Sequence, residues 1–388
     1  MANNNKHTGP NVPALRFPEF SGEWEQHSLS DYLRFKNGLN PDAKRFGKGI
    51  KFISVMDILN NASISYDCVR ASVAATEQEI SDFEVEYGDV LFQRSSETLE
   101  DIGRSNIYVD SRHCVFGGFV IRGKKIGEYE PYFMKYRLDS PYARKSIIVK
   151  GAGAQHFNIG QDGLSKVELF FPKYEEQVKI GDLLRIIDDR INTQSKIIED
   201  KETLYKAISS RLFSLYTNCS PTYKLGDIAK IYQPETIPST MLSCDGLYLV
   251  YGANGVIGRY DKYNHEKSQI CLTCRGNTCG NINFSQPYSW ITGNAMVINI
   301  DSNTDIIDKR FLYHYLHNYN FSPFISGSGQ PQIVRSTVEK LPVPNVNIQT
   351  QEKIVSILDS IVMSIDIARK KVDMNQNVKK YLLENLFI

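Results

Sequence analysis

The sequence predicts an α+β protein with two tandem globular domains of mixed α/β structure, each followed by a long helix, with the two helices pairing as an antiparallel coiled coil. Three observations predict this class. Motifs of the first half recur in the same order 172 to 196 residues later. Each half begins with short apolar segments bounded by turn residues, which are typical of strands. Each half ends in a long segment whose apolar residues alternate at spacings of four and three, the pattern of a coiled coil.

The composition is that of an ordinary folded protein with almost balanced charge. The 388 residues are 41% hydrophobic and 23% charged, with 45 Lys and Arg against 44 Asp and Glu. At about 150 residues per domain, this length corresponds to two or three domains. The balance excludes a mostly disordered chain. It also excludes nucleic-acid binding through bulk positive charge, so any such site must be a local patch.

The sequence carries no signal for secretion or membrane insertion. The N-terminal segment MANNNKHTGPN is polar, and no run approaches 18 consecutive apolar residues. The seven cysteines are an odd number and are unevenly spaced. We therefore expect a cytoplasmic protein with reduced thiols and no membrane contact.

The first globular domain is predicted over residues 15–172 and the second over residues 217–344. In the first domain, strands are expected within Ile50–Met56, Val85–Arg94 and Val115–Arg122, and helical pieces near Pro131–Ser146. In the second domain, strands are expected within Leu247–Tyr251, Gln269–Cys274 and Asn294–Ile300, and a helix near Lys309–Tyr319. Because similar motifs follow one another in the same order, a tandem duplication explains both domains.

The long helices are predicted over residues 173–216 and 345–388. The expected coiled-coil interface consists of apolar residues at alternating spacings of four and three: Ile180, Leu184, Ile187 and Ile191 in the first helix, and Ile354, Leu358, Ile361 and Ile365 in the second. Each residue of the second set lies 174 positions after its counterpart. Polar residues such as Lys201 and Asn375 interrupt the pattern at matching places. They either fix the register of the helices or lie where the interface is exposed.

No motif in the sequence predicts a catalytic or metal centre. The segment Gly118–Lys125 resembles a phosphate-binding loop but ends in Lys where Ser or Thr is needed to hold Mg²⁺. Phe116-Gly117-Gly118-Phe119 does not fit a cofactor loop. Cys271 and Cys274 lie three apart in an apolar strand, so they should face opposite sides and not share a zinc ion with Cys279 or His265. We therefore expect no catalytic residues and no metal ligands in this chain.

Several segments are candidates for binding nucleic acid. Residues 121–150 carry eight Lys and Arg against three acids, including Lys124 and Lys125, and form either a phosphate-facing patch or a solvated surface. The loops after two equivalent strands place an Arg, which can bind guanine, beside small polar residues, although an ordinary surface turn would look the same. The candidate DNA-binding residues in these loops and just after the two Gly-x-Gly turns are Arg94, Ser95, Ser96, Gln155, His156, Arg275, Asn277, Thr278, Gln330 and Gln332.

Over nearly all of its length, the chain resembles the specificity subunit of type I restriction–modification systems. The resemblance rests on segments at the starts of both halves, on the second-domain motifs and on the junctions into the long helices. These segments are Leu15–Phe20, Trp24–Asp31, Tyr223–Ile228, Tyr251–Gly258, Cys274–Gly280, Gly327–Gln332 and Glu175–Gln177 with Pro172. Asn254, within the second-domain motif, is a further candidate for DNA binding.

The resemblance implies a non-catalytic subunit that recognises double-stranded DNA. Each domain would read one half of a split target, and the paired helices would set the distance between the halves and dock two modification subunits. Those partners would bind S-adenosylmethionine and methylate adenine, whereas restriction subunits would use ATP and Mg²⁺ to translocate and cut DNA. No cofactor is therefore expected in this chain. Because the domains diverge between Asn40 and Glu84, the two halves of the target should differ.

Two other classes of function predict different behaviour. A coiled-coil scaffold whose globular ends bind proteins would show no salt-dependent DNA binding. A stand-alone methyltransferase or nuclease would show activity as the purified chain.

Overall fold

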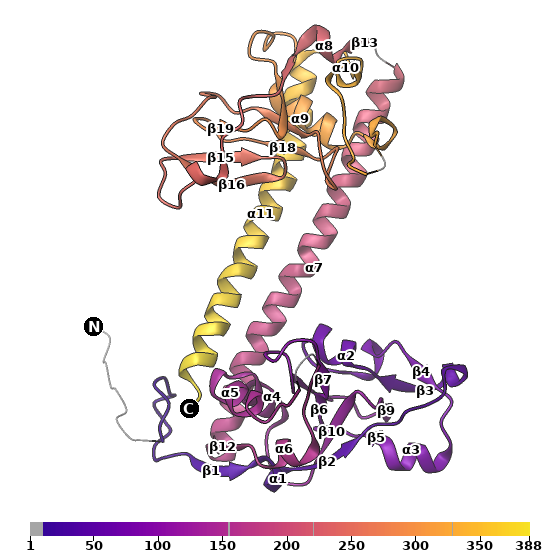
Figure 1. Ribbon diagram of the computed structural model, residues 1–388, viewed down its shortest axis with the longest axis vertical. Helices are drawn as coiled ribbons and strands as arrows, with labels where there is room; N and C mark the ends of the chain where they lie inside the picture. Colours follow the sequence, from indigo (N-terminus) through magenta and orange to yellow (C-terminus); the bar gives the residue numbers. More distant parts are fainter. Residues whose placement is uncertain (1–10, 154–155, 220, 328) are drawn as a thin grey trace. The chain divides into compact units, whose positions relative to one another are not determined.

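The computed structural model describes residues 11–153, 156–219, 221–327 and 329–388. The chain forms two compact units (Figure 1). Unit 1 comprises Met1–Gln194 and Lys370–Ile388, and unit 2 comprises Ser195–Arg369. Each long helix is therefore divided between the two units. In the described part of the chain, no helix is long and apolar enough to cross a membrane.

The long helices are α7 (Tyr174–Cys219) and α11 (Ile348–Asn385). In unit 1 the beginning of α7 lies beside the end of α11, and in unit 2 the end of α7 lies beside the beginning of α11 (Figure 1). The helices pack together, and this arrangement together with the mixed α/β domains confirms the predicted fold class. The expected interface residues are buried or partly buried. All of them except Ile365 belong to or pack against the two cores to which both long helices contribute.

The domain in unit 1 is built on two four-stranded sheets. The first is antiparallel, in the order β2 (Leu33–Asn37), β10 (Val120–Lys125), β6 (Val90–Gln93) and β8 (Ser105–Ile107). The second has the order β4 (Ser72–Val73), β3 (Phe46–Ile53), β9 (Cys114–Phe116) and β5 (Glu84–Val85), with β3 and β9 parallel. Every residue of β6 is buried, as expected for a continuous apolar run in the middle of a sheet.

Short helices and two-stranded pairs complete unit 1. Strand β1 (Glu25–Ser28) pairs with β12 (Glu168–Phe171), and β7 (Ser95–Ser96) pairs with β11 (Phe157–Asn158). Ser140 separates α4 from α5 because it caps the second helix, whose first residue is Pro141. The short helices are α1 (Leu29–Tyr32), α2 (Val55–Asn60), α3 (Glu77–Phe83), α4 (Pro131–Asp139), α5 (Pro141–Ile148) and α6 (Gln161–Ser165).

The domain in unit 2 repeats this plan in fewer residues. Its antiparallel sheet has the order β14 (Lys230–Tyr232), β20 (Ala295–Asn299), β17 (Ile270–Thr273) and β18 (Ile282–Phe284). A second sheet joins β16 (Gly255–Tyr260), β15 (Tyr248–Gly252) and β19 (Trp290–Ile291), with β15 and β19 parallel. The remaining elements are β13 (Thr222–Lys224) paired with β21 (Pro342–Pro344), α8 (Leu225–Ile228), α9 (Lys309–His317) and α10 (Arg335–Val338).

The core of each unit includes the end of a long helix. In unit 1, Phe387 packs against Trp24 and Phe133, with ring centroids 6.3 and 5.7 Å apart. In unit 2, Phe213 packs against Phe311 and Tyr315 at 5.6 and 5.4 Å. Phe213 and Phe387 hold equivalent places in the duplicated sequence, so both domains close their cores in the same way.

We expect Phe387→Ala to lower the stability of unit 1 by about 3–4 kcal/mol, because it removes a buried aromatic side chain and leaves a cavity. The measurement is the midpoint of urea unfolding followed by Trp fluorescence, since Trp24 lies against Phe387. Met374→Ala, at a site on α11 that is 60% exposed, is the matched control and should change stability by less than about 0.5 kcal/mol. Equal midpoints for both variants would show that the end of α11 does not contribute to this core.

Candidate functional site

In unit 1 the Arg94 loop lies beside the loop that contains His156. The short strand β7 immediately follows Arg94 and pairs antiparallel with β11, which follows His156. The Ser95 hydroxyl is hydrogen-bonded to the Asn158 side chain. Two of the predicted segments are therefore neighbours, and the His156 side chain is exposed. Gln155 lies outside the described residues.

Arg94 is held by the turn between β9 and β10. Its backbone N–H donates to the Phe119 carbonyl oxygen at 2.9 Å, and its guanidinium donates to the Gly118 carbonyl oxygen at 3.3 Å. Its own carbonyl oxygen accepts from the Ile159 N–H at 3.0 Å. The backbone of this residue is thus fixed by two neighbouring segments, and its side chain is directed along the β9–β10 turn.

Unit 2 brings together the equivalent segments. Arg275 forms an antiparallel bridge with Gln332, and the Gly276 N–H donates to the Pro331 carbonyl oxygen at 2.9 Å. The side chains of Arg275, Asn277, Gln330 and Gln332 are exposed, and that of Thr278 is partly exposed. Two loops separated by more than 50 residues in the sequence thus form one polar surface in unit 2.

Asn254 belongs to the same region of unit 2. It occupies the exposed turn between β15 and β16. The carbonyl oxygen of the preceding residue, Ala253, accepts hydrogen bonds from the Thr273 hydroxyl and, at 3.2 Å, from the Asn283 amide. Because Thr273 ends β17, just before the Arg275 loop, the turn is attached to that loop.

Lys124 and Lys125 lie elsewhere in unit 1. They end β10, whereas the Arg94 loop lies at the start of that strand, which is about 17–20 Å away for six residues in β conformation. The Lys124 ammonium is 3.1 Å from Glu86 and holds the pKa of that carboxyl below its usual value. Lys125 donates to the Tyr129 carbonyl oxygen at 2.8 Å. The structure therefore does not bring these two lysines to the loop site.

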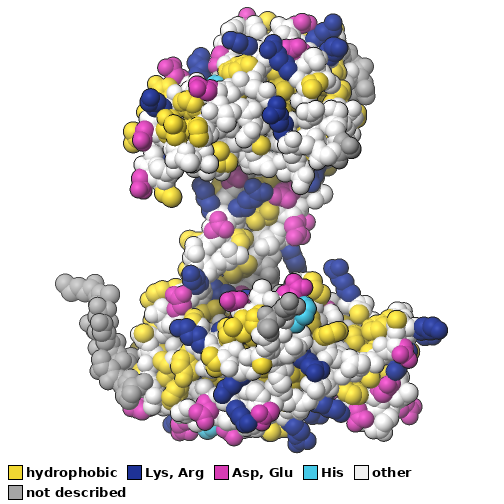
Figure 2. Space-filling view, viewed as in Figure 1, with side chains coloured by type: hydrophobic (Ala, Val, Ile, Leu, Met, Phe, Trp, Pro, Cys, Tyr) yellow, Lys and Arg dark blue, Asp and Glu magenta, His cyan; other side chains and the backbone are white. Residues whose placement is uncertain are grey.

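The basic run over residues 121–150 is mostly used inside the domain. Arg137 is completely buried and donates to the carbonyl oxygens of Phe170 and Ile388, at 3.0 and 2.6 Å. Arg144 donates to three backbone carbonyl oxygens, and Lys135 pairs with Asp139. On the visible face, Figure 2 shows Lys and Arg scattered among Asp and Glu and not gathered in one patch. Neither a continuous phosphate-facing patch nor a uniformly solvated surface describes this run.

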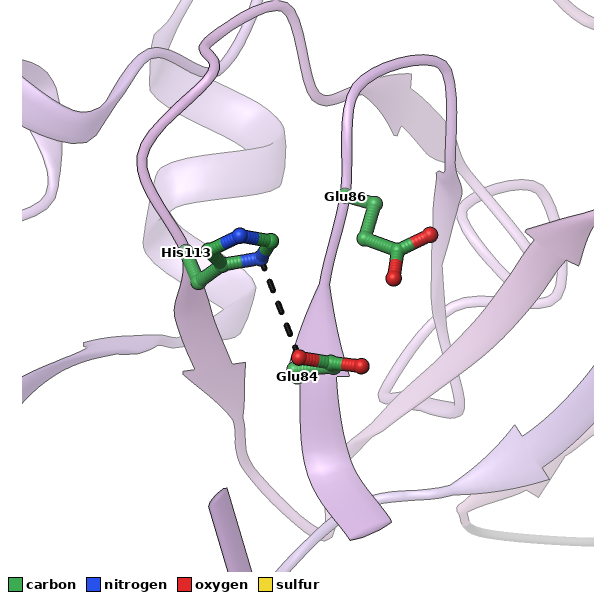
Figure 3. A group of neighbouring side chains, drawn as sticks. All are labelled: Glu84, Glu86 and His113. Carbon is green, nitrogen blue, oxygen red and sulfur yellow. Dashed lines mark ion pairs between the residues drawn. The ribbon is translucent and has the colours of Figure 1, made fainter. Parts of the chain in front are cut away.

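One group of potential metal ligands lies close together in the described part of the chain: Glu84, Glu86 and His113 (Figure 3). His113 Nδ1 is 3.8 Å from a Glu84 carboxylate oxygen, and the His113 side chain is 54% exposed. Glu86 is already paired with Lys124. The Lys124 ammonium competes with a metal ion for these carboxylates, so the three residues form a surface ion-pair cluster.

The strand cysteines face different cores, as the sequence predicts. Cys271 packs with Tyr251, Ile291 and Val297, whereas Cys274 belongs to the larger core of unit 2. Burial raises the pKa of the Cys271 thiol to about 12, so the reactive thiolate is rare at neutral pH. These two side chains are not placed to share a zinc ion.

Two exposed residues beside the Arg loops are not among the residues that the sequence predicts for the site. Phe119 ends the β9–β10 turn in unit 1, and Asn294 ends the equivalent β19–β20 turn in unit 2. The backbone oxygen of Phe119 accepts from Arg94, and that of Asn294 accepts from the Cys274 thiol at 3.5 Å. For Phe119, the sequence feature that could have indicated an exposed position is the preceding Gly117-Gly118 pair, which permits a tight turn.

Both halves of the chain thus share one arrangement of sheet and loops. Residues 21–200 and residues 220–373 both match the family model for the type I restriction modification DNA specificity domain, and the chain belongs to this family. The two matches also confirm the tandem duplication.

Two relatives that are named as type I specificity subunits match most of the chain. The chain is 23% identical over 415 residues to the putative type I restriction enzyme MjaX specificity subunit of Methanocaldococcus jannaschii. The alignment covers 97% of this chain and 95% of that relative. A putative type I specificity subunit of Mycoplasma genitalium is 23% identical over 278 residues, or 67% of this chain and 71% of the relative.

A solved structure has the same fold. The crystal structure of the type I restriction–modification S subunit from M. genitalium matches with a TM-score of 0.70 and 18% identity, over 97% of this chain and 99% of that chain. At this level of identity the match establishes the fold.

The burial of the strand cysteines predicts their reactivity. We expect Cys244→Ser to remove one fast-reacting thiol from the native protein, because Cys244 is exposed, and Cys271→Ser to leave the fast phase unchanged. The measurement is the reaction with 5,5′-dithiobis(2-nitrobenzoate) at pH 8. A fast phase that disappears with Cys271→Ser would contradict the buried position of this thiol.

Proposed function

We propose that this protein is the DNA-recognition subunit of a type I restriction–modification complex and that each domain reads one half of a bipartite target. The observation that carries the proposal is the repeated loop pair. In both units an Arg loop after a buried strand is bound to a second polar loop, which is β7–β11 in unit 1 and the Arg275–Gln332 bridge in unit 2.

The side chains of these loops have the chemistry needed to distinguish base pairs. An Arg guanidinium can donate two hydrogen bonds to guanine, and an Asn or Gln amide can pair with adenine in the major groove. Unit 2 exposes Arg275, Asn277, Gln330 and Gln332 on one surface. Unit 1 presents Arg94, Ser95, Ser96 and His156, so the two half-targets would differ in sequence. Lys124 and Lys125 would contact phosphates at most, because they lie at the other end of β10.

The docking of two modification subunits is the second part of the proposal. Met374, Val378 and Tyr381 lie on one face of α11, at spacings of four and three, and line a shallow depression with Lys370, Asp373 and Asn377. Val378 is 43% exposed in unit 1, and its counterpart Leu204 on α7 is 49% exposed in unit 2. Two equivalent apolar positions in one chain suit two copies of the same partner.

The remaining chemistry belongs to the partners. The modification subunits would bind S-adenosylmethionine and methylate adenine, and restriction subunits would use ATP and Mg²⁺ to translocate and cut DNA. This chain would supply target recognition without a cofactor. The complex would act on DNA in the cytoplasm.

We expect Arg275→Ala to relax recognition in one half-target, and Arg94→Ala to relax it in the other half. Loss of a bidentate contact to guanine costs about 1–3 kcal/mol of discrimination. The measurement is the methylation motif of host DNA after co-expression with a modification subunit. Lys262→Ala, which removes an exposed cation elsewhere in unit 2, should leave the motif unchanged.

The distribution of the loss distinguishes the possible roles of each Arg. A uniform loss over both half-targets would show that the Arg contacts a phosphate or supports the structure. If the wild-type complex neither methylates a bipartite motif nor binds DNA in a salt-dependent manner, the result would support a protein scaffold instead.

We expect Val378→Asp and Leu204→Asp each to lower the number of bound modification subunits from two to one, and the double variant to bind none. The reason is that a carboxylate placed in an apolar interface loses its hydration without gaining a partner. Native mass spectrometry of the purified complex measures the stoichiometry.

Gln376→Asp adds the same charge at an exposed position of α11 and should retain two modification subunits. Two bound subunits in the double variant would show that docking occurs elsewhere.

A further inference from the structure

The aromatic side chain of Phe119 is largely exposed to solvent. It is 70% exposed and lies in the turn between β9 and β10. Leaving apolar surface in water costs about 25 cal/mol per Å², so a ring in this position favours a partner that covers it. Single exposed apolar residues are common on protein surfaces, and Phe119 differs from them in how its turn is built and in what lies beside it.

The turn is fixed by hydrogen bonds along its backbone. The Gly117 N–H donates to the Ile53 carbonyl oxygen at 3.0 Å, and the Gly118 N–H donates to the Leu39 carbonyl oxygen at 2.9 Å. The Val120 N–H closes the turn onto the Gly117 carbonyl oxygen at 2.8 Å. Phe119 is therefore presented by a rigid backbone and not by a mobile loop tip.

The two positions before Phe119 are glycines and carry no side chain. A Cβ atom on Gly117 would lie 2.6 Å from the Phe52 ring, and one on Gly118 would lie 1.8 Å from the Asn40 amide oxygen. A side chain at either glycine would therefore require the Phe52 ring or the Asn40 side chain to move. The ring of Phe119 is consequently the one side chain that this turn projects from the surface.

The turn is part of the candidate DNA-binding surface of unit 1. Arg94 donates from its backbone to the Phe119 carbonyl oxygen and from its guanidinium to the Gly118 carbonyl oxygen. A base edge within reach of Arg94 would thus be close to the Phe119 ring. The surroundings are polar and carry a cation, with Ser95, Ser96 and His156 on the adjoining loops, which suits nucleic acid better than an apolar protein surface.

We propose that Phe119 inserts between two base pairs of the half-target read by the first domain, and that it bends the duplex there. This proposal rests on the proposed DNA-recognition function and adds to it a residue and a mode of reading. Proteins that bend DNA insert apolar side chains such as Phe at base steps, at the cost of partial unstacking. Flexible pyrimidine–purine steps unstack most easily, so Phe119 would select the step without a hydrogen bond to it.

The second domain differs at the equivalent position. Asn294 occupies this place in the β19–β20 turn and is exposed. The amide of an Asn side chain can form hydrogen bonds to adenine, but unlike an aromatic ring it cannot stack between base pairs. The distortion is therefore confined to the half-target of the first domain, which makes the second half-target an internal control.

The test uses the complex with its modification subunits and duplexes of the methylation motif. One set of duplexes carries a single 2-aminopurine at each position of the half-targets in turn, apart from the methylated base pair. A second set carries donor and acceptor dyes at its ends to report bending. We expect the wild-type complex to raise 2-aminopurine fluorescence at one step of the first half-target and to shorten the distance between the dyes.

Phe119→Ala should abolish both signals and lower affinity roughly tenfold, because the stacking of an aromatic ring on a base is lost. Phe119→Trp should retain both signals. Ile126→Ala is the matched control, since Ile126 is 50% exposed at the other end of β10, and it should behave as the wild type.

The outcomes separate this proposal from the proposed function. If the wild type binds its motif but Phe119→Ala shows the same fluorescence, bending and affinity, insertion is wrong and DNA recognition stands. If Phe119→Ala loses affinity without any change in the DNA signals, Phe119 touches DNA only from outside the stack, and insertion is again wrong. If the wild type does not bind the motif, the proposed function fails and the insertion fails with it.

Discussion

The burial of the two helix ends is the interaction on which the rest of this structure depends. Phe213 and Phe387 each fill the core of a domain to which the start of the other long helix also contributes. Neither domain has a complete core without both helices, and neither helix has a buried face at its ends without a domain. The loops that carry Arg94 and Arg275 follow central strands of these cores. The position of these loops is therefore fixed by packing that lies far from them in the sequence.

Each helix end also meets a polar group that differs between the two units. In unit 1, Asp188 accepts from Tyr136 at 2.7 Å and from Lys379 at 2.6 Å. In unit 2, the buried His314 joins Tyr205 and Asp359, each at 2.8 Å, and burial lowers the pKa of His314. Lys379 and Tyr205 hold equivalent places in the duplication. An exchanged helix end would place a lysine ammonium against His314 or remove the nearer of the two ammonium groups beside Asp188, so the two networks favour the observed pairing.

Repetition made the fold predictable, because the duplicated motifs and the four-three spacing are visible along the chain itself. The Arg loops and the segments after the Gly-x-Gly turns could be singled out because they hold equivalent places in the two copies. That they lie side by side depends on the β7–β11 pairing and on the Arg275–Gln332 bridge, which the sequence does not show. Charge counting failed over residues 121–150, since the sequence does not show that Arg137 and Arg144 bind backbone carbonyl oxygens inside the domain. Phe119 was missed because an apolar residue between two strands looks the same in a sequence whether it is buried or exposed. Its exposure depends on the contacts of Gly117 and Gly118 with distant segments.

The hydrogen bond from the Leu15 N–H to the Asn385 carbonyl oxygen, 2.9 Å long, has a consequence for evolution. It places the start of the first domain beside the end of α11, just as the second domain starts directly after the end of α7. The covalent path therefore follows a nearly closed ring of domain, helix, domain and helix. A circularly permuted chain, with its termini moved to another junction between a domain and a helix, would keep the same packing contacts. A reordering of the two halves of the chain can accordingly retain both domains and the core contacts of each unit.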